Sequence, residues 1–199
     1  ALLLDGGPEG CDLERQLIAL GVRKLDVVVV SHPHADHFAG LSECAGSVDV
    51  DLFVDATQVI ADPQAQADAT SAGGDPPSSG REGRQYLQLR RLLLAEGARY
   101  MEARTGTSLE VDGLTVDFYA PRVPLLMVDG ADPWRRRGEA PSGEELNASS
   151  VVALLRYGDT EVLLPGDAEA EVLARYALAA ADVVMVPHHG SKGAVTEDL

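Results

Sequence analysis

Hydrophobic residues in the first part of the chain alternate between short continuous runs and positions three or four residues apart. Short continuous runs are typical of buried strands, whereas the wider spacing is typical of a helix with one buried face. The pattern predicts a strand over 1–4, a helix over 13–20, a strand over 25–30, a short helix over 37–44 and a strand over 50–54. The β-branched run of the second strand indicates that both of its faces are covered.

The remainder of the chain is richer in predicted strands. A helix is expected over 86–95, followed by strands over 99–103, 108–111, 114–119, 151–156 and 161–164, a helix over 168–179 and a buried strand over 182–186. Two segments, about 61–84 and 122–146, contain proline and glycine without apolar periodicity and are expected to be irregular insertions. Two β-rich halves that each carry helices predict an α/β fold of two packed sheets with helices outside.

Composition agrees with one soluble, folded domain over residues 1–199. The chain has 199 residues, 45% of them hydrophobic and 24% charged, which allows one substantial core. No stretch is long and apolar enough to predict a membrane segment in this chain. A formal charge of −16 excludes a broad basic surface for nucleic acid. The two cysteines, Cys11 and Cys44, form no CxxC pair and fit either two free thiols or one bridge.

All five histidines fall in two places, each directly after a predicted strand. In the first, extended backbone would direct His32 and His34 to the same side, since side chains alternate along a strand. Asp36 and His37 would then face a neighbouring space as the chain turns into a helix. Two imidazoles toward one point, and a carboxylate with an imidazole toward another, predict a two-centre metal site suited to zinc, iron or manganese.

This cluster carries a resemblance to a known family. His32-x-His34-x-Asp36-His37 resembles the HxHxDH signature of the metallo-β-lactamase fold, and Leu4-Asp5-Gly6, Leu163-Leu164-Pro165-Gly166-Asp167 and Val186-Pro187-His188-His189-Gly190-Ser191 resemble further motifs in the same order. The last two are most similar to the hydrolase domain of ComEC-type DNA-internalisation competence proteins. The resemblance implies an αββα four-layer sandwich of two mixed sheets with outer helices. It also implies further chain at both ends.

The resemblance also implies roles for individual residues. His32 and His34 would hold the first of two divalent ions, zinc or manganese, while Asp36 and His37 would hold the second and Asp167 would bridge both. The second histidine pair would supply a further ligand, and both His188 and His189 are candidates. His189 is favoured as the ligand and His188 as a phosphate contact or proton donor. Asp36 and His188 are the candidate catalytic groups. Asp5 would orient the metal loops, and Ser191 and Lys192 are candidate substrate contacts.

Three of these residues have a simpler alternative. Asp167 could cap the helix expected after it, Asp5 could serve only its Asp-Gly turn, and Asn147 could be an ordinary turn residue. The family pattern has a further histidine in the stretch where this chain has Asn147. The ComEC-like subgroup also has asparagine there. Because an amide suits a harder ion better than zinc, the first centre is expected to be weak or to favour manganese.

The expected activity is hydrolysis of a phosphodiester by a metal-activated water, with single-stranded DNA as the nucleic acid substrate. Arg135, Arg136 and Arg137 form a local basic cluster that could contact phosphate or bases, although a solvated surface explains it as well. The alternatives are a hydrolase of a lactone, thioester or small phosphoester, and a binding module without turnover.

Overall fold

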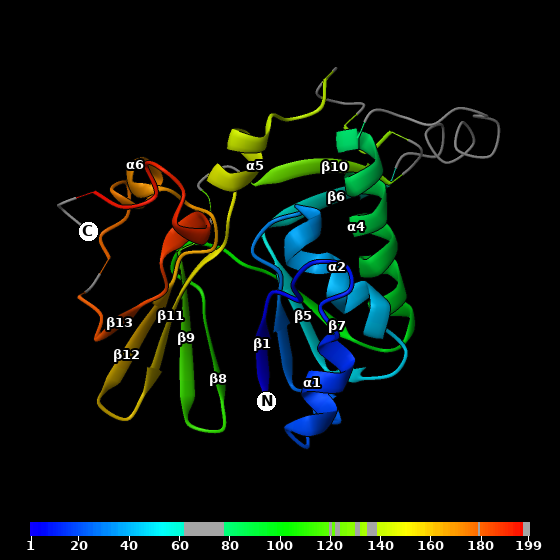
Figure 1. Ribbon diagram of the computed structural model, residues 1–199, viewed down its shortest axis with the longest axis horizontal. Coiled ribbons are helices and arrows are strands. Elements are labelled where there is room, and N and C mark those ends of the chain that lie inside the picture. Colours follow the sequence, from blue (N-terminus) through cyan, green and yellow to red (C-terminus); the bar gives the residue numbers. More distant parts are fainter. Residues whose placement is uncertain are drawn as a thin grey trace.

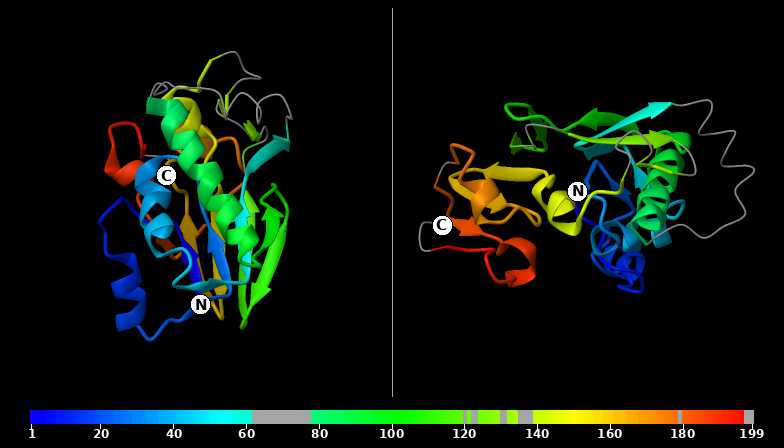
Figure 2. Two further views of the ribbon diagram at one scale, coloured as in Figure 1. Left: turned by 90° about the vertical axis from the view of Figure 1, so that its right-hand side faces the viewer. Right: turned by 90° about the horizontal axis from the view of Figure 1, so that it is seen from above.

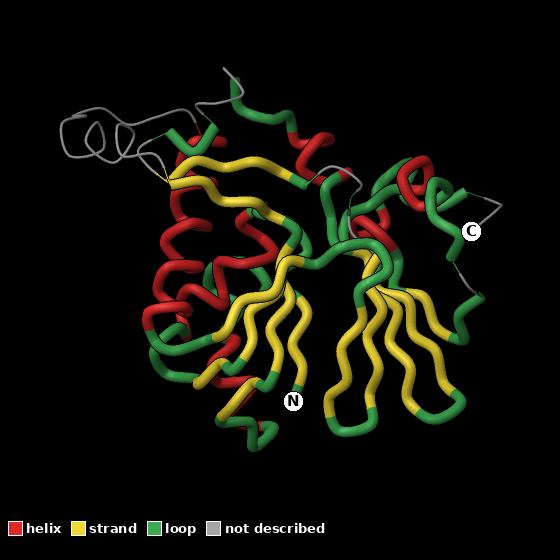
Figure 3. The backbone as a smooth tube through the Cα atoms, turned by 180° about the vertical axis from the view of Figure 1, so that it is seen from behind, coloured by secondary structure: helices red, strands yellow, loops and turns green. Residues whose placement is uncertain are grey.

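The computed structural model describes residues 1–61, 78–119, 121, 124–129, 132–134, 139–178 and 180–196, and places two sheets side by side (Figures 1 and 3). The first sheet has four parallel strands in the order β1 (Leu2–Leu4), β3 (Val27–Val29), β5 (Leu52–Asp55) and β7 (Arg99–Glu102). The second has five, in the order β13 (Val183–Val184), β12 (Thr160–Leu164), β11 (Val152–Tyr157), β9 (Leu114–Tyr119) and β8 (Ser108–Val111). The strands of the second sheet are antiparallel except for the pair β12 and β13.

Two short parallel pairs and a set of helices complete the described part. The pairs are β2 (Lys24–Leu25) with β4 (Asp49–Val50), and β6 (Thr57–Ala61) with β10 (Leu125–Asp129). The helices are α1 (Leu13–Ala19), α2 (Ala35–Cys44), α4 (Ser78–Ala95), α5 (Gly143–Ala148), α6 (Ala170–Leu173) and the 3₁₀ turn η1 (Pro187–Gly190). None of the helices in the described ranges is long and apolar enough to cross a membrane.

Alternation along the central strands produces the layers. Val28 belongs to the core cluster under α2 and α4, whereas its neighbour Val29 packs with Ala153 between the two sheets. In the second sheet, Leu154 faces the other way and packs with Leu173 of α6. Seen from above, α4 and α6 lie at opposite ends with the sheets between them (Figure 2). The predicted α/β sandwich of two sheets with outer helices is therefore confirmed, although the first sheet is parallel rather than mixed.

The two predicted insertions contain regular structure that the sequence pattern does not reveal. Helix α4 begins at Ser78, eight residues before the expected start at Tyr86, and residues 62–77 lie outside the described part. The second segment contains β10 and most of α5. A Cβ at Gly83 would lie 3.2 Å from Trp134, so glycine here allows close packing of α4 rather than breaking it.

Two predictions near the end of the chain are wrong. The expected helix over 168–179 is reduced to α6, because the chain turns after Leu173 and packs Tyr176 against Tyr119, with ring centroids 6.3 Å apart. Tertiary packing here outweighs helix propensity. The expected buried strand over 182–186 is the short edge strand β13, in which Val183 is 53% exposed.

The strand predicted over 25–30 is also divided. Leu25 ends β2 and Val27 begins β3, with Asp26 between them receiving a hydrogen bond from the chain's amino terminus. All three valines of β3 are buried, which confirms that both faces of this strand are covered.

Candidate metal centre

The histidine clusters lie together at one edge of the two sheets. Residues 31–34 follow β3 and lead into α2, Asp167 follows β12, and η1 follows β13. In Figure 1 this edge is the upper one, where the start of α2, helix α5 and η1 (red) meet, and Figure 3 shows the strand ends that converge there. Ligands of parallel α/β sheets bind beyond the carboxyl ends of the strands, and β3 reaches the cluster by that end.

Helix α2 is held tightly against the turn that follows β1. The Gly6 amide donates to the carbonyl of His37 at 2.6 Å, and the Gly40 amide donates to the carbonyl of Gly7 at 2.9 Å. A Cβ at Gly40 would lie only 2.3 Å from the carbonyl oxygen of Gly6. The absence of a side chain at Gly40 therefore allows α2 to bring His37 against the turn.

Asp5 lies in this turn and binds both strand and helix. Its backbone is left-handed, with φ of 60°, which is uncommon outside glycine. Oδ1 accepts from the Ser31 amide at 2.7 Å, and Oδ2 accepts from the Ser31 hydroxyl at 2.8 Å and from Nδ1 of His37 at 2.7 Å. The carboxylate therefore orients the His37 ring so that Nε2 faces the cluster.

Asp167 lies at the centre of the cluster. Its Oδ1 is 3.3 Å from Nε2 of His37, and its Oδ2 is 3.8 Å from Nε2 of His32 and of His188 and 3.7 Å from Nε2 of His189. Four imidazoles from two segments thus surround one buried carboxylate. Asp167 does not cap α6, whose N-cap is Glu169.

The described residues form two groups with metal-ligand geometry that share His37. In each group, one ligand atom per residue lies within 4.8 Å of the others. One group is His32, His37 and Asp167, and the other is Asp36, His37 and His189. His34 adjoins the first group, because its Nδ1 lies 2.8 Å from Nε2 of His32.

Burial and charge shift the pKa values of His32 and His37 in opposite directions. Burial, followed by the nearby His37 and His34, holds the pKa of His32 well below its usual value, so His32 is neutral. Burial also lowers the pKa of His37, but the carboxylates of Asp167 and Asp5 outweigh it and raise the pKa to about 10. Burial raises the pKa of Asp167, yet the contact with His37 reverses this and keeps it below its usual value. A divalent cation can take the place of the His37 proton.

Two buried atoms indicate that this cluster fits a metal. Among the residues that the structure describes, Nε2 of His37 and Oδ1 of Asn147 are the buried side-chain polar atoms without a hydrogen-bond partner. Buried polar groups are almost always satisfied, so each exception needs an explanation. Neutral imidazole, carboxylate and amide oxygen are together a donor set for divalent ions such as zinc or manganese.

The second histidine pair adopts an unusual backbone. His188 and His189 have φ values of 46° and 51°, and such strain in non-glycine residues concentrates at functional sites. The two side chains diverge, with ring centroids 6.2 Å apart. Nε2 of His189 lies 3.3 Å from Asp36, whereas Nδ1 of His188 lies 2.8 Å from Glu169.

The remaining predicted site residues differ in their placement. Asn147 is buried in α5 rather than in a turn before the strand, and its Nδ2 lies 3.2 Å from Nε2 of His188. Ser191 donates to Glu169 at 3.1 Å, and Lys192 is exposed beside it. Arg135, Arg136 and Arg137 lie outside the described residues.

Three residues of the cluster are missed by the sequence-based reasoning. Glu169 contacts His188, Ser31 links Asp5 to Nδ1 of His32 at 3.0 Å, and the Ser150 hydroxyl accepts from the Asp167 amide at 3.2 Å. Ser31 and Glu169 could have been found only because they lie next to recognised motifs. No such signal marks Ser150.

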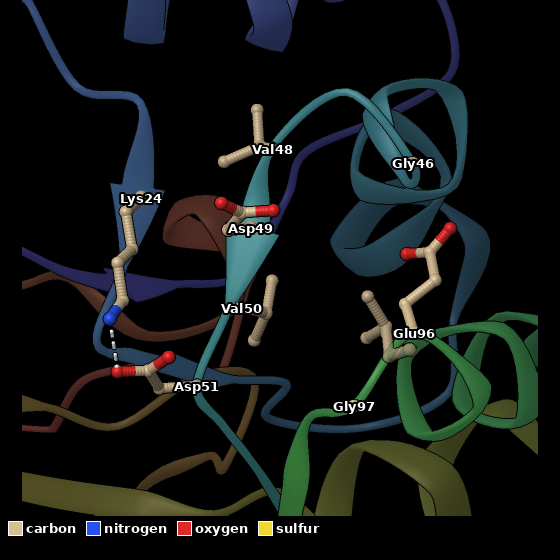
Figure 4. Close-up of a pocket in the computed structure, with 9 residues that line it drawn as sticks. Lys24, Gly46, Val48, Asp49, Val50, Asp51, Glu96 and Gly97 are labelled. Carbon is tan, nitrogen blue, oxygen red and sulfur yellow. Dashed lines mark ion pairs between the residues drawn. The ribbon is translucent and has the colours of Figure 1, made fainter.

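A separate hollow of about 400 Å³ lies away from the cluster (Figure 4). It lies where β4 leads into β5, close to the point where β7 begins, which is the amino edge of the parallel sheet. Its one ammonium group, that of Lys24, is paired with Asp51 at 2.7 Å. None of the candidate metal ligands lines this hollow.

Comparisons with known proteins identify the family of the chain. A family model described as the metallo-beta-lactamase superfamily matches residues 1–199. The chain is 25% identical over 187 residues to ComE operon protein 3 of Bacillus subtilis (strain 168), covering 92% of the chain but 19% of that relative. The chain thus spans about a fifth of the length of the curated relative.

Solved structures are similar to the chain at lower identity. MEM-A1, a subclass B3 metallo-beta-lactamase isolated from a soil metagenome library, matches with a TM-score of 0.52 and 14% identity, over 95% of this chain and 69% of that one. Zn²⁺-bound PqqB from Methylobacterium extorquens matches with a TM-score of 0.49 and 19% identity, over 92% of this chain and 54% of that one.

Proposed function

The chain belongs to the metallo-beta-lactamase superfamily, a family of metal-dependent hydrolases, and we propose that it cleaves phosphodiester bonds, with single-stranded DNA as the substrate. The observation that carries the proposal is the buried Asp167, which has the Nε2 atoms of four histidines within 3.8 Å. In this proposal Asp167 would be shared by two cations.

The proposed ligands fall into two sets that share Asp167. His32 and His34, with the amide oxygen of Asn147, form the first set. Asp36, His37 and His189 form the second, supported by the 3.3 Å separation of His189 from Asp36. Two divalent cations held there would supply Lewis-acid activation of the ester and of water.

The other polar residues prepare these ligands. Asp5 accepts from Nδ1 of His37 and turns Nε2 toward Asp167, and ligand histidines generally need such a partner. His188 would protonate the leaving alkoxide, and the contact of its Nδ1 with Glu169, which leaves Nε2 facing the cluster, supports this role.

DNA as substrate is supported by the ComEC-type resemblance and by the similarity to ComE operon protein 3. The charge of −16 works against long-range attraction of a polyanion. Nucleic acid would therefore bind through a few local contacts, and the cluster Arg135, Arg136 and Arg137 is the proposed source. We expect a shallow salt dependence, about −0.7 per contacted phosphate on a single strand.

The test is a panel of three substrates with manganese or zinc: a labelled single-stranded oligonucleotide, a nitrophenyl phosphodiester and a lactone. We expect both phosphodiesters to be cleaved and Asp167→Ala to be inactive, with the exposed Asp159→Ala as the matched control. Metal binding without turnover of any substrate would favour a binding module instead.

A small-molecule hydrolase is the second candidate, and one observation favours it. A hollow of about 430 Å³ adjoins Asp36 along α2, within the usual size of small-ligand pockets, and it is bordered by Glu9 and Glu43. Acidic borders suit an uncharged or cationic group better than a phosphate chain.

The arginine cluster separates the two candidates. Replacing Arg135, Arg136 and Arg137 with alanine should lower oligonucleotide cleavage while sparing the nitrophenyl ester. The control replaces Arg15 and Arg23, which lie in or near α1, away from the edge where the candidate ligands gather (Figure 1). An unchanged ratio of the two activities would favour the small-molecule candidate.

A further inference from the structure

Ser150 is a buried residue beside the cluster that the proposed ligand sets do not use. It lies between α5 and β11 and is only 1% exposed. Its hydroxyl accepts a hydrogen bond from the backbone amide of Asp167 at 3.2 Å and lies 3.3 Å from Nδ1 of His32. One hydroxyl therefore contacts two proposed ligands, of which one follows the first sheet and the other follows the second.

The hydrogen bond to Asp167 has a fixed direction. A backbone amide can only donate, so the Ser150 oxygen accepts from Asp167 whatever the protonation of the nearby imidazoles. Within the described part of the chain, no backbone carbonyl accepts from this amide. Asp167 is itself buried, and a buried amide without a partner costs free energy. The Ser150 hydroxyl therefore favours the one position of the turn in which this amide is satisfied.

Packing around Gly166 holds the same turn closely against Ser150. Gly166 has a φ of 58°, and a Cβ there would lie 3.2 Å from Cβ of Ser150 and 2.9 Å from Cβ of Ser31. The absence of a side chain thus lets residues 165–167 lie directly on the two serines. The carbonyl of Gly166 also accepts from the His188 amide at 3.1 Å, so η1 is attached to the turn that Ser150 supports.

We propose that Ser150 is a positioning residue that holds the turn 165–167, and with it the carboxylate of Asp167, where two divalent cations would share it. The inference rests on the proposed function in assigning Asp167 to both metal centres. It predicts that loss of the Ser150 hydroxyl weakens both centres. A role through the contact with His32 alone would weaken only the first.

The neighbouring Ser149 supplies a matched control. It is also buried, at 7% exposed, but its hydroxyl donates to the carbonyl of Leu146 at 2.6 Å and so stays within the end of α5. Ser149→Ala and Ser150→Ala each remove one buried, hydrogen-bonded hydroxyl. Only Ser150→Ala removes a contact with the proposed ligands.

The hydrogen bond can be tested without metal. In ¹⁵N-labelled, metal-free protein, hydrogen exchange of the Asp167 amide should become about 2–10-fold faster in Ser150→Ala, relative to the amides of β12, as expected for loss of one hydrogen bond. Ser149→Ala should leave this relative rate unchanged. An Asp167 amide that exchanges equally fast in the unaltered protein and in Ser150→Ala would overturn the inference.

Calorimetric titration of Mn²⁺ tests whether the position of the turn matters to the metal. Ser150→Ala should weaken both Mn²⁺ sites about 10–100-fold, the range for loss of a group that orients a ligand. Ser149→Ala should leave both affinities unchanged. Weakening of one site only, or equal weakening by the two variants, would overturn the inference.

Phosphodiester cleavage separates this inference from the proposed function. If Ser150→Ala weakens both Mn²⁺ sites but the unaltered protein cleaves no phosphodiester, only the proposed function is refuted. If the unaltered protein cleaves phosphodiesters and Ser150→Ala binds Mn²⁺ as tightly as it does, only the role of Ser150 is refuted.

Discussion

Replacing Gly40 with alanine tests whether the contact between α2 and the Asp5 turn sets up the metal centre. The added Cβ would lie 2.3 Å from the carbonyl oxygen of Gly6 and 2.4 Å from Sγ of Cys11. The first of these is backbone, so the helix must move away from the turn. That movement would lengthen the bond from the Gly6 amide to His37 and separate Asp5 from Nδ1 of His37.

The expected magnitude follows from opposing contributions. Overpacking costs about 1–3 kcal/mol, and two weakened backbone hydrogen bonds cost about 1 kcal/mol each. Alanine in a helix recovers about 1 kcal/mol relative to glycine. The net loss is roughly 2–4 kcal/mol, which for a chain of this size lowers the melting temperature by roughly 4–16 °C.

The assay is thermal unfolding of the metal-free protein followed by circular dichroism, combined with calorimetric titration of Mn²⁺. Because Asp5 would lose its hold on His37, we expect affinity at the second centre to fall about 10–100-fold. The matched control is Ser42→Ala, an exposed position of the same helix. A Gly40→Ala protein that melts like the unaltered chain would refute the packing argument.

Three further outcomes are expected. Elemental analysis should find less bound metal in Asp167→Ala than in His37→Ala, because the first residue is assigned to both centres; equal metal in both variants and the unaltered protein would contradict the ligand sets. Manganese should support faster phosphodiester hydrolysis than zinc, since an amide at Asn147 suits a harder ion, and activity confined to zinc would contradict this. In the metal-free protein, the raised pKa of His37 contributes stability that is fully present below about pH 6.5 and is lost as the pH rises toward 10. The melting temperature should therefore fall over that interval. A flat profile would show that the contact of His37 with Asp167 contributes little.

The strands were predictable because their apolar runs and alternation are local properties of the sequence. The predictions failed where tertiary contacts decide: α4 extends through Gly83, which packs against Trp134, and the expected helix after Asp167 ends at Leu173. Composition alone carries no information about either contact.

The site divides in the same way. His32 to His37 lie within six residues, so their chemistry is visible as a motif. Ser150 is 118 residues from His32 in sequence, yet its hydroxyl lies 3.3 Å from Nδ1 of that ring. A lone serine has no distinguishing pattern, and its contribution emerges only when the second sheet packs against the first.

The candidate metal centre lies across the junction of the two sheets, which links its chemistry to folding. Ser31, which follows the first sheet, accepts a backbone hydrogen bond from Val151 at 2.8 Å, and a Cβ at Gly166 would lie 2.9 Å from Ser31. His32 and Asp167 therefore reach their positions only when the sheets are docked. In the metal-free protein this docking buries imidazoles and a carboxylate together, which costs free energy that the ion pair recovers only in part. Cations that bind the docked sheets but not the unfolded chain stabilise the folded state by mass action. The residues that weaken the metal-free fold are therefore the same residues through which metal binding would stabilise the fold.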